Sequence, residues 1–136
     1  MNSTVSGNPV LPLIGRILIA ALFLVAGIGK AMSFAGTAGY MAKVGFPVPE
    51  VMTAIAIVIE AGGAILLILG WKTRWVAWAL AIFVVIATLA AHRFWDIQDA
   101  AQMVSQRTQF LKNLAIIGGL LFVAAFGPGS ISVDKH

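Results

Sequence analysis

Long apolar runs separated by short polar segments organise this chain. Four runs are long enough to cross a bilayer, at about residues 11–31, 51–70, 75–91 and 110–126, since a spanning helix needs roughly 20 mostly apolar residues. Backbone polar groups inside lipid must be satisfied within the segment, so these runs predict helices. The pattern therefore predicts an all-α fold, a transmembrane four-helix bundle, with residues 1–136 as a single domain.

Prolines and glycines mark the ends of these runs. Pro47 and Pro49 precede the second run, and neither continues a regular helix. The sequence GWKTRW at 70–75 predicts a tight hairpin between the second and third runs. Residues 34–46 are too short and glycine-rich to span, so we expect a short interfacial helix there. Residues 93–109 are polar enough to leave the membrane, and Arg93 and Asp96 have the i,i+3 spacing of an ion pair on a short helix.

Composition supports membrane insertion. Hydrophobic residues make up 60% of the chain and charged residues 10%, against roughly 45–50% and about 25% in soluble domains. The net charge of +4 comes from lysines and arginines scattered singly along the chain. This distribution suits contact with anionic lipid headgroups and does not suggest nucleic-acid binding.

The absence of cysteine limits the chemistry of the chain. It excludes disulfides, thiol relays, zinc–thiolate sites and iron–sulfur clusters within these 136 residues. One of the two histidines is the C-terminal His136, so no haem ligand pair is expected, and no metal site is predicted. Electrons for any redox reaction would come from a partner or a substrate.

Four spans place both termini on the side of the 70–75 hairpin. Lysines and arginines flank both ends of the spans, but this hairpin is the shortest loop and is purely basic. The positive-inside rule then favours cytoplasmic termini in a bacterial-type inner membrane. The N-terminal residues lack a basic region before the first run, so we expect this run to remain as a membrane anchor.

Charged residues within the runs are the strongest functional signal, because each costs about 2.5–3.5 kcal/mol on insertion. Arg16 and Lys30 share one face of the first helix at 100° per residue. Glu60 lies near the middle of the second run, where a carboxylate must be paired, protonated or functional. Side chains tilt toward the helix N-terminus, which favours a Glu60–Lys30 pair over Glu60–Arg16. Lys112 is an alternative to either Lys30 or Arg16 as the charged partner.

Further polar side chains gather at the end of the bundle opposite the hairpin. His92 and Trp95 continue one face of the third helix, and Lys112 and Asn113 begin the fourth run. The candidates for ligand binding or proton relay are thus Glu60, Lys30, His92, Arg16, Lys112, Asn113 and Trp95.

Structural roles for these candidates stay open beside the functional ones. In the structural alternative, the basic side chains extend along the helix surface to the lipid headgroups (snorkelling). Trp95 is then part of an interfacial aromatic belt, His92 forms an interfacial hydrogen bond, and Asn113 links two helices.

Four segments resemble the DoxX family of small four-helix membrane proteins. They are GRILIAALFLVAGIGK at 15–30, IEAGGAILLILGWKTRWVA at 59–77, HRFW at 92–95 and QFLKNLAIIGGLLF at 109–122. The resemblance implies a four-helix transmembrane bundle with polar positions at Arg16, Lys30, Glu60, His92, Lys112 and Asn113.

The resemblance implies no single activity and no catalytic residue. Similar proteins are linked to thiosulfate:quinone oxidoreductase subunits, to membrane redox and thiol-stress complexes, and more distantly to eukaryotic membrane assembly factors. We therefore expect an accessory of a membrane redox system, whose polar cluster binds a quinone or another small ligand. One alternative is a non-enzymatic assembly subunit that binds a membrane protein partner or forms a homo-oligomer. A second is a small proton-coupled transporter with Glu60 as the carrier.

Overall fold

The computed structural model describes residues 7–134, and within them every regular element is helical. The segments are α1 (Val10–Met32), α2 (Phe34–Lys43), α3 (Pro49–Ile57), the π-helix η2 (Val58–Gly62), α4 (Gly63–Leu69), α5 (Thr73–Ala91), the 3₁₀ helix η3 (Phe94–Asp96) and α6 (Ala100–Phe126). Because α3, η2 and α4 are continuous, four helices are long and apolar enough to cross a membrane. The predicted all-α transmembrane fold is confirmed.

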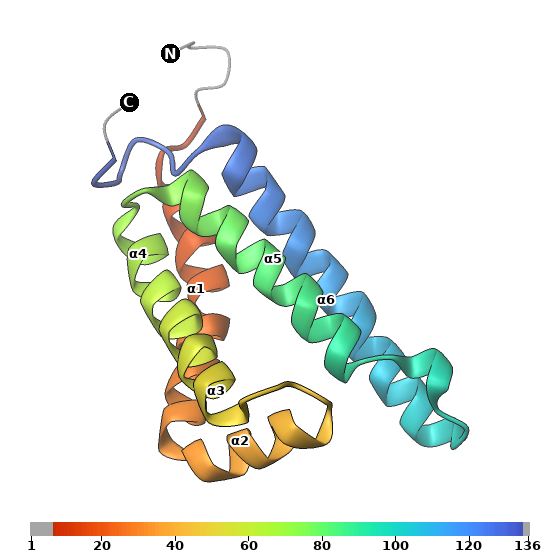
Figure 1. The fold of residues 1–136 in the computed structure, drawn as a ribbon. Helices are drawn as coiled ribbons and strands as arrows, with labels where there is room; N and C mark the ends of the chain where they lie inside the picture. The colour runs from red at the N-terminus through yellow and green to blue at the C-terminus, as the bar shows by residue number, and fades with distance from the viewer. Residues whose placement is uncertain (1–6, 135–136) are drawn as a thin grey trace.

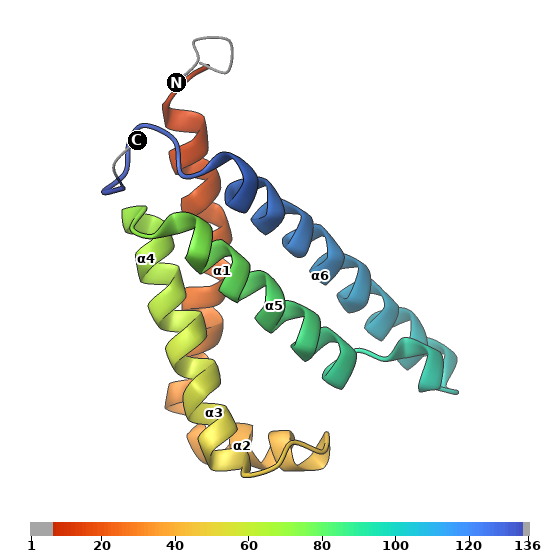
Figure 2. The same cartoon turned by 45° about the horizontal axis from the view of Figure 1, so that its top comes forward.

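The four spanning helices form two pairs that make a wedge. α1 packs beside the α3–η2–α4 helix, and α5 packs antiparallel to α6. Figures 1 and 2 show the pairs close together near the loop between α4 and α5, and apart at the other end, where α2 lies across the opening. The start of α1 and the segment after α6 lie at the closed end of the wedge.

The buried residues of the first two spans lie along one helical stripe on each helix. On α1 the buried residues are Arg16, Ala20, Phe23 and Gly27. On the second span they are Thr53, Ala56, Glu60, Ala64 and Leu67. Both stripes contain small residues, as expected where helices pack closely within a membrane.

Gly27 makes the closest approach between α1 and the second span. A Cβ atom at this position would lie 2.8 Å from the backbone nitrogen of Ala61 and 3.0 Å from its Cβ. We expect Gly27→Ala to push the two helices apart and lower the free energy of unfolding by about 1–3 kcal/mol, measured by denaturation with sodium dodecyl sulfate in mixed micelles.

Gly29 supplies the matched control two residues along the same helix. A Cβ atom there would meet nothing within 4 Å, so Gly29→Ala should be neutral or slightly stabilising. Equal effects of the two substitutions would contradict the close helix contact at Gly27.

The segment after α6 closes the hairpin end of the bundle. Its backbone nitrogens at Val133 and Asp134 donate to the carbonyls of Leu69 and Gly70, at 3.0 and 2.9 Å. The Asp134 carboxylate also accepts from the backbone nitrogens at the start of α5, at Lys72 (2.6 Å) and Thr73 (2.9 Å). The carboxylate thus supplies the cap that the first turn of α5 needs.

The fourth helix begins earlier than the sequence predicts. It starts at Ala100 instead of about residue 110, because the Asp99 side chain accepts from the backbone nitrogen of Gln102 at 2.9 Å and caps the first turn. Its 27 residues extend about 40 Å at 1.5 Å per residue, which exceeds the roughly 30 Å hydrocarbon core. The helix is therefore long enough for its polar first turns to lie outside that core.

Two smaller expectations for the connecting segments are confirmed. Residues 34–43 form the short helix α2. Arg93 and Asp96 form the i,i+3 ion pair, with Nε and Oδ2 at 3.0 Å on side chains that are both about half exposed. Exposed pairs of this kind contribute little to stability.

Candidate functional site

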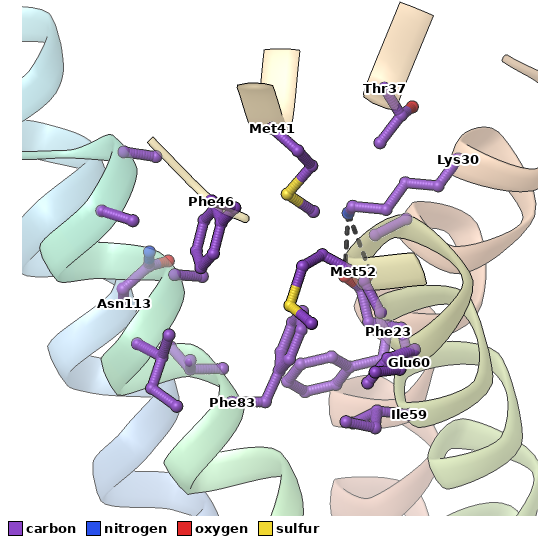
Figure 3. Close-up of a pocket in the computed structure, with 18 of the residues that line it drawn as sticks. Phe23, Lys30, Thr37, Met41, Phe46, Met52, Ile59, Glu60, Phe83 and Asn113 are labelled. Carbon is purple, nitrogen blue, oxygen red and sulfur yellow. Dashed lines mark hydrogen bonds and ion pairs between the residues drawn. The ribbon is translucent and has the colours of Figure 1, made fainter. Parts of the chain in front are cut away.

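The space between the two helix pairs holds a cavity of about 580 Å³, a size typical of sites for small molecules. Residues from α1, α2, the second span, α5 and α6 line it (Figure 3). Its walls are mainly aliphatic, with aromatic rings and thioethers from Phe23, Met41, Phe46, Met52 and Phe83.

The cavity is not enclosed by protein. Four of its lining residues on the spanning helices, Leu22, Ile55, Ile82 and Ile86, are 43–55% exposed. Exposed aliphatic side chains on a spanning helix face the hydrocarbon of the bilayer. This side of the cavity therefore presents apolar side chains that suit contact with lipid.

An ion pair lies in the wall made by α1 and η2. Lys30 Nζ is 2.8 Å from Glu60 Oε1 and 3.1 Å from Oε2 (Figure 3). The Glu60 side chain is 3% exposed and that of Lys30 28%. Lys30 is near the end of α1, and its long side chain reaches inward to the carboxylate. The predicted Glu60–Lys30 pairing is confirmed, in preference to Arg16 or Lys112.

Glu60 stands in a turn of π-helix, which sequence reasoning missed. The element covers Val58–Gly62 within an otherwise α-helical span. Single π turns in α-helices frequently coincide with functional sites. The signal available in the sequence is the pair Gly62–Gly63, because two glycines weaken the preference for a regular α-helix.

A second polar group lies on the opposite wall, made by α5 and α6 (Figure 3). Asn113 Nδ2 donates to Thr88 Oγ1 at 2.9 Å, and His92 Nδ1 is hydrogen-bonded to Gln106 Oε1. Asn113 and His92 both line the cavity. Gln106 was not among the site residues predicted from the sequence, although it lies seven residues before Asn113 and therefore on the same helical face.

Lys112 and Trp95 lie outside the cavity. Lys112 is exposed, because it precedes Asn113 by one residue and so points about 100° away from the inward face. Trp95 is 51% exposed and packs edge-on against Phe94 and Phe110. It lies in the 3₁₀ helix η3, where the face of α5 no longer continues.

Arg16 is deeply buried but belongs to the closed end of the wedge. Its guanidinium donates to the carbonyls of Leu67 (2.9 Å), Ile68 (3.1 Å) and Ile131, and the residue is 2% exposed. The side chain therefore does not snorkel to the headgroups. It joins α1 to the end of the second span and to the segment after α6, and it does not line the cavity.

Four of the seven candidate residues thus meet in one place. Lys30, Glu60, His92 and Asn113 line the same cavity, on two facing walls. The arrangement offers hydrogen-bond donors and acceptors at both walls and apolar surface between them, so it can hold an apolar molecule that carries polar groups.

Comparisons with known proteins agree with this architecture. The sequence profile of the DoxX family matches residues 11–93. Inner membrane protein YphA of Escherichia coli (strain K12) is 40% identical over 132 residues, which cover 96% of this chain and 93% of that protein. Inner membrane protein YqjF of the same organism is 37% identical over 123 residues, covering 90% and 88%.

A more distant likeness extends to a eukaryotic protein. The Surfeit locus protein 4 homolog of Schizosaccharomyces pombe is 26% identical over 124 residues, which cover 90% of this chain and 36% of that protein. No solved structure gives a significant match. From its family match, its two bacterial relatives and its four spanning helices, this chain is a multi-pass inner membrane protein that belongs to the DoxX family.

Proposed function

We propose that this protein binds a small lipid-soluble molecule within the membrane, as an accessory of a membrane redox system, and that a quinone is the candidate ligand. The observation that carries the proposal is the cavity itself, which contains a buried ion pair and opens toward lipid. A buried charged pair inside a spanning bundle is costly to maintain, and such residues usually mark ligand or proton pathways.

The two walls suit a flat head with polar groups at opposite edges. The Lys30 ammonium has three N–H donors, so its contacts with Glu60 leave capacity to donate to a ligand oxygen. Asn113 offers an amide on the facing wall (Figure 3). Phe23 and Phe83 supply ring surfaces between them. In this proposal Glu60 also accepts or returns a proton at the ligand head, and a partner protein supplies the electrons.

Photoaffinity labelling with a short-chain azidoquinone tests this proposal. We expect labelled peptides from α3 and α5, competition by excess unlabelled quinone, and a loss of labelling in Glu60→Gln of about tenfold, the equivalent of one charge-assisted hydrogen bond. Glu50→Gln is the matched control, because Glu50 is exposed and does not line the cavity. Labelling that excess quinone does not reduce would contradict the proposal.

We further propose that both termini face the cytoplasm. The loop between α4 and α5 is at the same end as the segment after α6 (Figure 1). This loop carries Lys72, and Arg74 follows in the first turn of α5; the positive-inside rule favours such basic residues on the cytoplasmic side.

A cysteine-accessibility experiment tests this orientation. Because the chain has no cysteine, a single Ser130→Cys substitution should react with a membrane-impermeant maleimide only after permeabilisation. Ser105→Cys, on the exposed early part of α6, should react in spheroplasts. The reverse labelling pattern would contradict cytoplasmic termini and would place them on the opposite side of the membrane.

A further inference from the structure

We infer that the cavity selects an uncharged head: it takes a neutral amphiphile whose head accepts hydrogen bonds, and it rejects the corresponding anion. This inference rests on the proposed function, because it requires the cavity to be a ligand site. It goes beyond that function by defining the charge of the ligand. The charge balance of the cavity walls supports it.

The positive charge in the cavity is already compensated. Among the lining residues, the lysine is Lys30 and the acidic residue is Glu60, and their side chains are in direct contact at 2.8 Å. An anionic ligand would therefore bring an additional charge that no lining residue balances. Burying an unpaired charge among apolar side chains is strongly unfavourable.

Other basic residues do not change this balance. Lys43, Arg93 and Lys112 are all exposed and do not line the cavity. His92 does line it, but it interacts with the neutral amide of Gln106. The far wall therefore presents hydrogen-bonding groups and no second lysine or arginine.

A neutral head gains contacts without disturbing the ion pair. An oxygen of a ketone, alcohol or ester can accept a hydrogen bond from Lys30 while Glu60 keeps its own contacts with the ammonium. The apolar remainder of the molecule then lies against the aliphatic and aromatic walls or extends into the lipid through the open side of the cavity. The ligand class is thus a neutral lipid-phase amphiphile.

Two probes that differ only in the head group test this selectivity. Hexadecanol and hexadecanesulfonate carrying the same diazirine are applied to the protein in neutral detergent micelles, and covalent labelling of the cavity peptides is quantified. For the native chain we expect labelling by the alcohol to exceed labelling by the sulfonate by roughly tenfold or more, since the sulfonate charge would be buried without a partner.

Removing the charge compensation should reverse the preference. In Glu60→Gln the Lys30 ammonium lacks its carboxylate, so the sulfonate should become the better probe. The double variant Lys30→Gln/Glu60→Gln is neutral again and should prefer the alcohol, as the native chain does. Glu50→Gln changes the net charge equally at an exposed position and should leave the ratio unchanged.

The outcomes separate this inference from the proposed function. Equal labelling by both probes in the native chain, or an unchanged ratio in a folded Glu60→Gln variant, overturns the charge selectivity and leaves the ligand site standing. A double variant that prefers the sulfonate also overturns it. Labelling by neither probe above the level of the exposed lipid-facing peptides contradicts the ligand site and the selectivity together.

Discussion

Replacing Arg16 with methionine is expected to lower the free energy of unfolding by about 3–5 kcal/mol, a large share of the stability of a small domain. Arg16 is 2% exposed, and its guanidinium donates to three carbonyls, those of Leu67, Ile68 and Ile131. Methionine fills much of the volume but leaves these acceptors without their donor. The Leu67 carbonyl, whose hydrogen bond with Arg16 is buried, then bears the full cost of desolvation.

Three parts of the chain lose their common link in this variant. Arg16 connects α1 with the end of the second span and with the segment after α6, which also caps α5 through Asp134. Unfolding titrations with sodium dodecyl sulfate measure the loss. Arg93→Met is the control, because the Arg93 side chain is 54% exposed, and it should cost less than about 1 kcal/mol. A similarly small effect for Arg16→Met would contradict its role at the closed end.

Replacing Lys30 with methionine is the second substitution with a large expected effect. It leaves the Glu60 carboxylate, 3% exposed, without a counter-charge inside the bundle. Breaking a buried pair by removing one partner costs about 3–5 kcal/mol. We expect a loss of this size in the same unfolding titration, together with loss of labelling by the azidoquinone.

Removing both charges should restore much of the stability. The double variant Lys30→Met/Glu60→Met replaces the buried pair by apolar side chains, which is often neutral or stabilising. A double-mutant cycle then gives a strong coupling between the two positions. Additive effects would show that the two side chains do not act as a pair. The double variant should still lose quinone labelling, which separates binding from folding.

Much of the fold follows from physical limits on membrane-spanning helices, and these limits can be read from the residue pattern. The thickness of the hydrocarbon core requires long apolar helices, so the four spans were predictable to within a few residues except at the start of the fourth. The 100° rotation per residue placed Arg16 and Lys30 on one face of α1, and both side chains have partners inside the bundle. The tilt of side chains toward the helix N-terminus selected the Lys30–Glu60 pair correctly.

The wedge and its cavity were not predictable in the same way. They depend on the angle between the two helix pairs, and therefore on contacts between particular residues of the two pairs, such as Gly63 of α4 with Leu80 of α5. The hydrogen bonds that Arg16 donates depend on the carbonyls of Leu67 and Ile131, which are far away in sequence. Every residue has a backbone carbonyl, so a residue pattern does not indicate which carbonyls accept from Arg16.

The direction in which each side chain points explains why the predicted site residues Lys112 and Trp95 lie outside the cavity. Lys112 and Asn113 are adjacent in sequence, yet one is exposed and the other lines the cavity, because neighbouring residues on a helix point about 100° apart. Trp95 lies beyond the end of α5, where the 3₁₀ helix turns the chain. Residues with helical spacing do not share a face when one of them lies beyond the end of the helix, so the spacing alone does not place them in one site.

Native mass spectrometry of the gently purified protein, with analysis of its organic extract, tests the central claim most directly. The account predicts a neutral lipid-soluble molecule bound at a stoichiometric level, which is lost in the stable double variant Lys30→Met/Glu60→Met and kept in Glu50→Gln. An empty native bundle, or a molecule retained equally by the double variant, would contradict the assignment of the Lys30–Glu60 cavity as a ligand site.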